Sequence, residues 1–326
     1  MSRPIIDIYC HIVPEKYKKA LISKSQASLI LKELDGVSKN FPALSDLQLR
    51  LKILGQHEGM RQVLTIIPPL EILSPNHAVE LSKIANEEMA ELVAKYPDQF
   101  AGGVACLPLN DMDAALREAE RAVKDLKLKG VQLYTPCNGK PLDSPIFLPL
   151  YEMAAKFDLP VWLHPSRGID VSDYVDEKES KFNVFLSIGW PYETTVGMVR
   201  LVRGGVLERF PTLKIITHHL GGMTPYFFNR LKWRAHVKES GDSAIELRRS
   251  PREYFKMFYA DTMVGDNVPA LMCGHAFFGT EHVVFASDIP SPVDYEEKIA
   301  PIERMPISES EKALIFEGNA QKLLHI

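Results

Sequence analysis

Eight short apolar runs recur along this chain of 326 residues, and they constrain its fold more than any other feature. Each run has the length and the β-branched composition of a strand that is buried on both faces. The runs cover residues 4–9, 61–67, 100–106, 129–135, 159–164, 213–219, 256–262 and 282–288. Helical apolar spacing lies between some of them, as at 76–97 and 111–127. Strands that alternate with helices build a parallel sheet, and eight such strands close a barrel, so we predict an α/β fold, a (β/α)₈ TIM barrel.

Unequal spacing between the runs adds two insertions to this barrel, one after strand 1 and one after strand 5, near residues 12–60 and 165–212. Both follow the carboxyl ends of strands, where a barrel carries its active site. The stretch 166–183 is charged and rich in turn residues, which fits either a mobile lid or a solvated loop. No linker interrupts the pattern, so we expect a single domain over residues 1–326. An open doubly wound sheet is the alternative architecture.

Two helix starts carry capping signals. Asp111 stands where it can cap the helix of residues 112–127, and Ser308 with Glu311 forms the capping-box pattern that opens the last helix.

Composition excludes several classes of function. The net charge is −4 and no long basic block occurs, which argues against a nucleic-acid partner. No apolar run reaches membrane-spanning length, and the first residues do not fit a signal peptide. The four cysteines, at 10, 106, 137 and 273, form no CxxC pair and fit reduced thiols. We therefore expect a cytoplasmic enzyme or binding protein with a small-molecule partner.

Imidazoles and one carboxylate stand at the carboxyl ends of four runs: His11, His164, the pair His218 and His219, and Asp288. Each alone is more often structural, a hydrogen-bonded histidine or a turn aspartate. Together they suit a divalent transition metal with an open coordination position. Because neighbours in a strand face opposite ways, only one of His218 and His219 is expected to point into the barrel mouth.

Five stretches resemble, in the same order, motifs of the amidohydrolase superfamily: "YCHIVP", "LPVWLHP", "LKIITHHLGG", "VVFASDIPSP" and "GNAQKLL". The likeness extends over essentially the whole chain and is strongest to the branch that contains aminocarboxymuconate semialdehyde decarboxylase and gamma-resorcylate decarboxylase. This resemblance implies a TIM-barrel enzyme, and residues 138–165 are similar to that branch almost element by element.

The resemblance also implies roles for individual residues. His11 and His164 match metal ligands, and Asp288 matches an aspartate that binds the metal and can handle a proton. The family pattern of histidine, one residue and glycine fits His219-Leu220-Gly221. That selects His219 over His218 as the catalytic acid or base beside the metal.

Three residues are expected to bind substrate: Tyr9, Arg230 and Trp190. Arg230 corresponds to an arginine that, in the semialdehyde decarboxylase, reaches the substrate carboxylate of a neighbouring subunit, which implies a homodimer or a higher homo-oligomer. An ordinary surface arginine on a helix is the other interpretation. Trp190 lies where family members place an aromatic near the pocket, although core or interface packing would also explain it.

The sequence departs from the family at Tyr9, where family members carry histidine or glutamate. A neutral phenol is a poor ligand, with an unperturbed pKa near 10. Three interpretations stay open: Tyr9 binds the metal as a phenolate, or His11, His164 and Asp288 hold it alone, or the metal is lost. Zinc is the first expectation for the metal and manganese the second.

These observations favour one function and leave two alternatives. The leading hypothesis is a metal-dependent, non-oxidative decarboxylase, a carboxy-lyase, that acts on an aromatic or unsaturated carboxylic acid. The same residues would also serve a metal-dependent hydrolase or hydratase of a small carboxylated ring or conjugated acid. A metal-free divergent member of the family, with Tyr9 in place of a ligand, is the third possibility.

Overall fold

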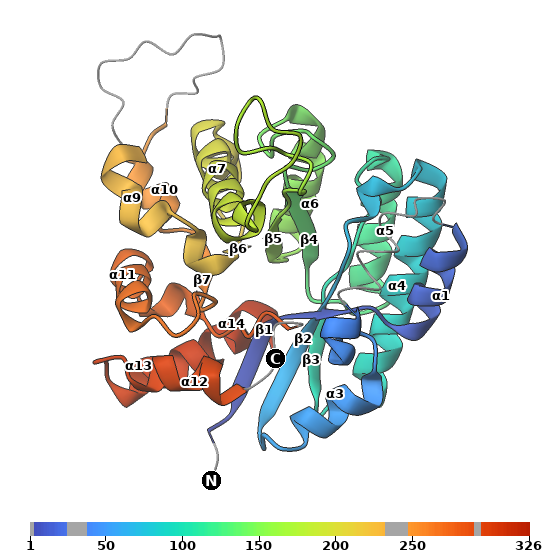
Figure 1. The fold of residues 1–326 in the computed structure, drawn as a ribbon, viewed down its shortest axis with the longest axis horizontal. Coiled ribbons are helices and arrows are strands. Elements are labelled where there is room, and N and C mark those ends of the chain that lie inside the picture. Colours follow the sequence, from blue (N-terminus) through green and yellow to red (C-terminus); the bar gives the residue numbers. More distant parts are fainter. Residues whose placement is uncertain (1–2, 25–37, 232–246, 290–294) are drawn as a thin grey trace. The chain divides into compact units, whose positions relative to one another are not determined.

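The computed structural model describes residues 3–24, 38–231, 247–289 and 295–326. Strands and helices alternate along it (Figure 1). The strands are β1 (Ile5–Ile12), β2 (Met60–Ile66), β3 (Phe100–Gly103), β4 (Val131–Thr135), β5 (Val161–Pro165), β6 (Ile215–Thr217), β7 (Tyr259–Asp261) and β8 (Val283–Val284). The helices are α1 (Glu15–Lys24), α3 (Leu47–Leu54), α4 (Pro75–Lys95), α5 (Met112–Lys124), α6 (Leu148–Lys156), α7 (Trp190–Arg203), α8 (Val206–Arg209), α9 (Thr224–Leu231), α10 (Pro251–Phe255), α11 (Val268–Phe278), α12 (Tyr295–Glu303), α13 (Glu309–Ala313) and α14 (Asn319–Leu324).

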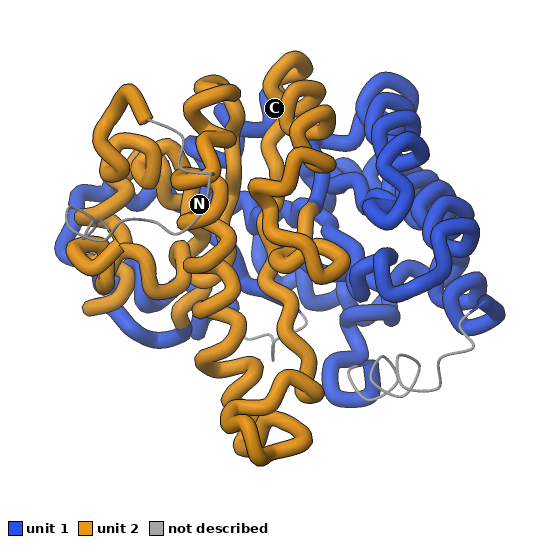
Figure 2. Tube along the Cα trace, turned by 90° about the horizontal axis from the view of Figure 1, so that it is seen from above, with its two compact units in different colours: residues 1–132, 265–268, 284–326 blue, residues 133–264, 269–283 orange. Residues whose placement is uncertain are grey.

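The chain divides into two compact units (Figure 2). Unit 1 comprises residues 1–132, 265–268 and 284–326, and unit 2 comprises residues 133–264 and 269–283. The single domain expected from the sequence stays a prediction.

Unit 1 holds a parallel sheet in the order β1-β2-β3. Every residue of β1 is buried, as its apolar run predicts for a strand covered on both faces. The other edge of β1 pairs with the chain that follows β8. There Ile8 N donates to Phe285 O (3.0 Å) and His11 N donates to Ile289 O (2.8 Å). Since β1 has a neighbour on both edges, its tip is held on both sides.

Unit 2 carries most of a second sheet, whose strand order is β4-β5-β6-β7-β8. The pairs β5–β6 and β6–β7 are parallel, with Val161 opposite Ile215 and Ile216 opposite Tyr259. In both sheets the strands follow chain order. A doubly wound sheet requires a reversal of strand order, which the described strands do not show.

The structure bears out the local predictions. All eight runs contain a strand, and Asp111 caps α5 by accepting a hydrogen bond from Ala114 N (3.0 Å). Ser308 and Glu311 form the capping box at the start of α13. Residues 166–183 form no helix or strand, and Ser180 Oγ donates to the Asp173 carboxylate (2.9 Å) within them. Residues 25–37 of the first insertion lie outside the described residues.

No helix among the described residues combines the length and the apolar composition needed to cross a membrane.

Candidate active site

His11, Thr65 and Asp288 form a first tip group at the end of β1 in unit 1. His11 lies opposite Thr65 in the register of β1 and β2, and its Nδ1 shares a hydrogen bond of 2.7 Å with Thr65 Oγ1. His11 Nε2 lies 3.2 Å from Asp288 Oδ1. Two ligand atoms bonded to one metal ion at about 2.1 Å lie roughly 3 Å apart. The first tip group therefore offers a nitrogen and an oxygen at a separation that fits a metal ion.

Asp288 reaches this position through a left-handed backbone conformation, with φ of 55°. Aspartate tolerates this region better than most residues, and such strained positions cluster at functional sites. Asp288 N donates to Tyr9 O (3.1 Å), which fixes the turn against β1.

A buried polar network contacts the backbone of the first tip group. Arg50, on α3, donates from Nε to Ala43 O (3.1 Å), from Nη1 to Gln62 Oε1 (2.9 Å), and from Nη2 to the carbonyl oxygen of His11. Burial lowers the pKa of the Arg50 guanidinium. Arg50 thus satisfies three buried acceptors, one of them on the predicted ligand itself.

Asp7 is the acidic member of this network and is fully buried. Its carboxylate accepts hydrogen bonds from Ser287 N (2.9 Å), from the Ser287 hydroxyl and from Tyr295 OH (3.2 Å). Burial raises the pKa of the Asp7 carboxyl, and the hydrogen bonds oppose that rise. Asp7 therefore holds the residue that immediately precedes Asp288.

Tyr9 is completely buried, and its ring stands edge-on to the ring of His11, with centroids 6.0 Å apart. The side chain thus lies beside the predicted ligand, as the sequence pattern expects. Whether its phenol binds a metal stays a prediction.

His164, His218 and Asp261 form a second tip group, in unit 2. His164 Nδ1 lies 2.6 Å from Pro165 O at the end of β5. His218 Nδ1 is hydrogen-bonded to Asp261 Oδ2, and both side chains are fully buried. The rings of His164 and His218 have centroids 5.2 Å apart. Each imidazole is therefore held through Nδ1, so Nε2 is the ring nitrogen that we expect to bind a metal.

His219 stacks on His218, with ring centroids 4.0 Å apart and an interplanar angle of 27°. The expectation that these neighbours face opposite ways is therefore wrong. The strand β6 ends at Thr217, so the alternation of side chains along a strand does not extend to His218 and His219. The backbone of His219 is also left-handed, with φ of 52°.

The turn after His219 continues in left-handed conformations at Leu220, Gly221 and Gly222, with φ of 54°, 74° and 60°. A Cβ at Gly222 would lie 2.3 Å from Pro191 O, so only glycine fits there. Asp261 Oδ1 accepts a hydrogen bond from Leu220 N (2.9 Å). Asp261 thus clamps both His218 and the turn that presents His219.

Trp190, the first residue of α7, lies against these histidines. Its ring centroid is 5.5 Å from that of His164 and 6.2 Å from that of His219. The indole Nε1 donates to Arg167 O (3.2 Å), which orients the ring. The structure therefore brings Trp190 to the predicted site residues of unit 2.

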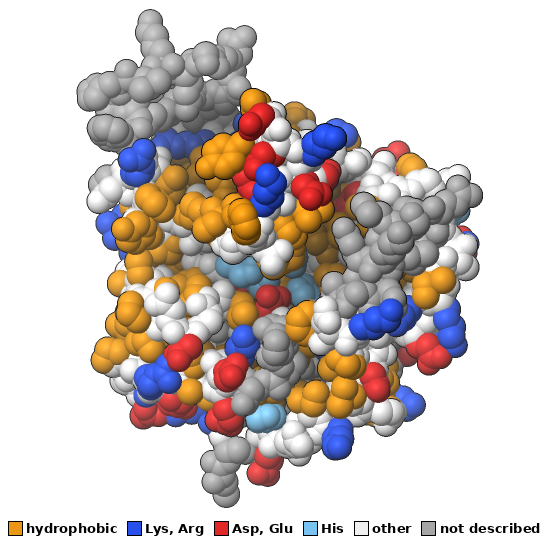
Figure 3. All heavy atoms as spheres, viewed as in Figure 1, with side chains coloured by type: hydrophobic (Ala, Val, Ile, Leu, Met, Phe, Trp, Pro, Cys, Tyr) orange, Lys and Arg blue, Asp and Glu red, His pale blue; other side chains and the backbone are white. Residues whose placement is uncertain are grey.

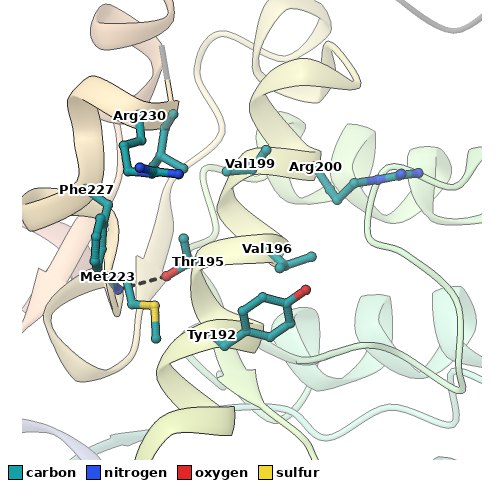
Figure 4. Close-up of a pocket in the computed structure, with 9 residues that line it drawn as sticks. Tyr192, Thr195, Val196, Val199, Arg200, Met223, Phe227 and Arg230 are labelled. Atoms are coloured by element: carbon teal, nitrogen blue, oxygen red, sulfur yellow. Dashed lines mark hydrogen bonds between the residues drawn. The ribbon is translucent and has the colours of Figure 1, made fainter. Parts of the chain in front are cut away.

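Arg230 lies in a different feature, a groove of about 420 Å³ between α7 and α9 (Figure 4). Phe227 and Arg230 line it from α9, while Tyr192 and Thr195 line it from α7. Thr195 Oγ1 accepts a hydrogen bond from Met223 N (2.8 Å) at one end. Hydrophobic side chains gather at the surface over these two helices (Figure 3), with Tyr226 79% and Tyr192 50% exposed.

Sequence reasoning missed Thr65 and Asp261. Both stand at or near the carboxyl ends of runs that the sequence reveals as strands, "RQVLTII" and "KMFYADT". Their position at strand tips was the available signal, but a hydroxyl or a lone acid there gives no spacing pattern of its own.

The model of the family described as Amidohydrolase matches residues 71–326. The chain belongs to this family. It is similar to 2-amino-3-carboxymuconate-6-semialdehyde decarboxylase of Dictyostelium discoideum, with 27% identity over 86% of this chain and 76% of that protein. Gamma-resorcylate decarboxylase of Polaromonas sp. is 29% identical, over 85% of this chain and 86% of that protein.

A solved structure of dihydroxybenzoic acid decarboxylase from Polaromonas sp., with bound manganese and the inhibitor 2-nitroresorcinol, has a TM-score of 0.82 and 25% identity. The match covers 100% of this chain and 97% of that chain. The predicted resemblance is thus confirmed, and the family member has the (β/α)₈ barrel fold that its strand order indicates.

Proposed function

We propose that this family member is a metal-dependent, non-oxidative decarboxylase of an aromatic or unsaturated carboxylic acid. The carrying observation is the pair of tip groups, in which each histidine is held through Nδ1 at a strand end. The decarboxylase relatives support the reaction class, and the manganese in the Polaromonas enzyme supports a divalent metal.

We assign metal binding to His11, His164 and Asp288. The donor set fits, because imidazole nitrogen and carboxylate oxygen suit divalent transition metals. A bound metal would act as a Lewis acid toward the substrate carboxylate. Zinc was the first expectation from the sequence, whereas the relative's manganese favours manganese here.

His219 delivers the proton in this proposal, and Asp288 is a second group able to carry it. The proton bonds to the carbon that bears the carboxylate, the carbon–carboxylate bond breaks, and CO₂ leaves with no change of redox state. The turn of left-handed residues holds the His219 imidazole in place for this transfer. Trp190 packs against the aromatic or conjugated part of the substrate.

Arg230 belongs to a second part of the proposal, a homodimer. The exposed apolar side chains of α7 and α9 around the groove support an interface there. Arg230 would then serve the substrate carboxylate of the neighbouring subunit. A cytoplasmic location is also proposed, supported by four cysteines that form no disulfide.

A substrate panel tests the function. The purified protein is loaded with Mn²⁺ and given 2,6-dihydroxybenzoate, 5-carboxyvanillate or 6-methylsalicylate, and released CO₂ is measured. We expect CO₂ from at least one such hydroxylated aromatic acid, with no ¹⁸O from labelled water in a new C–O bond of the product. Turnover that keeps the carboxylate and incorporates ¹⁸O would overturn the proposal in favour of a hydrolase or hydratase.

A further inference from the structure

We propose that His218 is an additional metal ligand in this chain, and that Asp261 orients it. The inference rests on the proposed function, since the metal is that of the decarboxylase. The histidine-x-glycine motif of the family matches His219 and not His218. The proposed proton transfer also gives His218 no role.

The environment of His218 resembles that of a metal-bound imidazole. The ring is fully buried, and its Nδ1 is hydrogen-bonded to the buried carboxylate of Asp261. Ligating histidines commonly give their second nitrogen to a carboxylate, which fixes the tautomer and raises the basicity of the coordinating nitrogen. With the proton on Nδ1, His218 presents Nε2 as a lone-pair donor.

His164 is oriented in the same sense. Its Nδ1 lies 2.6 Å from Pro165 O, so it too presents Nε2. One ring nitrogen of His164 lies within 4.8 Å of one ring nitrogen of His218, and the rings are tilted by 40°. Nitrogens bonded to one ion at about 2.1 Å lie at most about 4.2 Å apart, so small ring rotations suffice to bring both onto an ion.

An additional imidazole ligand would compensate for the poor donor strength of Tyr9. A phenol at position 9 is a poor neutral donor, whereas imidazole is among the best donors for divalent metals of this type. His218 would add a second imidazole nitrogen beside that of His164 in unit 2.

A structural role is the competing explanation. Asp261 Oδ1 also accepts hydrogen bonds from Leu220 N (2.9 Å) and Met263 N (3.0 Å), so the His218–Asp261 pair alone would hold the turn of His219. The test must therefore detect ligation itself and not only loss of activity.

The experiment compares wild type with His218→Cys, His218→Asn, Asp261→Asn and the control His275→Asn, after chelation and titration with Co²⁺ or Mn²⁺. His275 is a half-buried histidine of unit 2 that lies on α11, and its Nε2 shares a hydrogen bond of 2.7 Å with Thr280 Oγ1. We expect His218→Asn to weaken metal binding at least 100-fold and Asp261→Asn about 10- to 100-fold, with the control unchanged. In His218→Cys loaded with Co²⁺, a thiolate-to-cobalt charge-transfer band absent from wild type is expected.

Metal affinity unchanged in a folded His218→Asn protein, or a His218→Cys protein that binds Co²⁺ without the thiolate band, would overturn the inference. A wild-type protein that binds no metal would overturn it as well. Failure of the proposed function gives a different result, since the wild-type protein would then bind metal but release no CO₂ from any acid tested.

Discussion

Both tip groups hold an imidazole at the end of a strand, but the hydrogen-bond partner of the imidazole differs between them. In the first, the neutral hydroxyl of Thr65 meets His11 Nδ1 at 2.7 Å. In the second, the buried carboxylate of Asp261 meets His218 Nδ1. Because a carboxylate raises the basicity of the imidazole more than a hydroxyl does, we expect the second group to bind a cation more strongly per histidine.

The groups also differ in backbone. The first group contains one left-handed residue, Asp288, whereas four consecutive left-handed residues, from His219 to Gly222, follow His218 of the second. The longer left-handed turn places the imidazole of His219 beside that of His218. The comparison therefore supports the proposal that both groups bind metal and that His219, beside the second group, delivers the proton.

The largest expected effect comes from His219→Asn, which removes the proposed proton donor but keeps a residue that tolerates a left-handed backbone. We expect the decarboxylation rate to fall by about 10²- to 10⁴-fold while metal content stays unchanged. The matched control is His325→Asn, because His325 also has φ of 52° but is exposed in the last residues of the chain. Equal losses in the two variants would mean that the backbone, and not the imidazole, matters.

Arg50→Met tests how strongly the first group depends on its buried network. The substitution leaves the carbonyls of Ala43 and His11 and the amide oxygen of Gln62 without their donor, which we expect to destabilise the fold by about 3 kcal/mol. Urea unfolding measures the change, with the exposed Arg117→Met on α5 as the control. A midpoint shift no larger than that of the control would show that the network does not stabilise β1.

Thr65→Val sharpens the comparison of hydroxyl and carboxylate. Loss of the hydroxyl frees His11 to rotate, and we expect metal affinity to fall about 10-fold, less than in Asp261→Asn. Thr65→Ser keeps the hydroxyl and should bind metal as wild type does. Metal titration of wild type and the three variants measures these affinities, and a larger loss for Thr65→Val than for Asp261→Asn would reverse the ranking of the two groups.

The smallest effect concerns pH. Because burial raises the pKa of Asp7, the folded state favours the protonated acid. The contribution to stability is fully present below the ordinary aspartate pKa and is lost as pH rises through the raised value. Asp7→Asn should reduce this fall in the free energy of unfolding with rising pH, whereas the exposed control Asp98→Asn should show the same fall as wild type. Parallel stability profiles of wild type and Asp7→Asn would contradict the assignment.

Strand positions and metal-ligand candidates were accessible to sequence reasoning because both follow simple patterns. Buried parallel strands are apolar runs, and His11, His164 and Asp288 stand at their ends. The stacking of His218 on His219 was not accessible, since it depends on where β6 ends and on the left-handed turn. Thr65 and Asp261 were missed because their role comes from pairing with a neighbour distant in the sequence, which no local pattern records.

The most direct test of the account is decarboxylation with metal removal and return. The aromatic acid is labelled with ¹³C in its carboxylate, and the protein is assayed as purified, after chelation, and after Mn²⁺ is added back. The account predicts ¹³CO₂ from the first sample, a loss of at least 100-fold after chelation and recovery with Mn²⁺. Release of ¹³CO₂ that is indifferent to chelation, or turnover that leaves the label in the product, would contradict it.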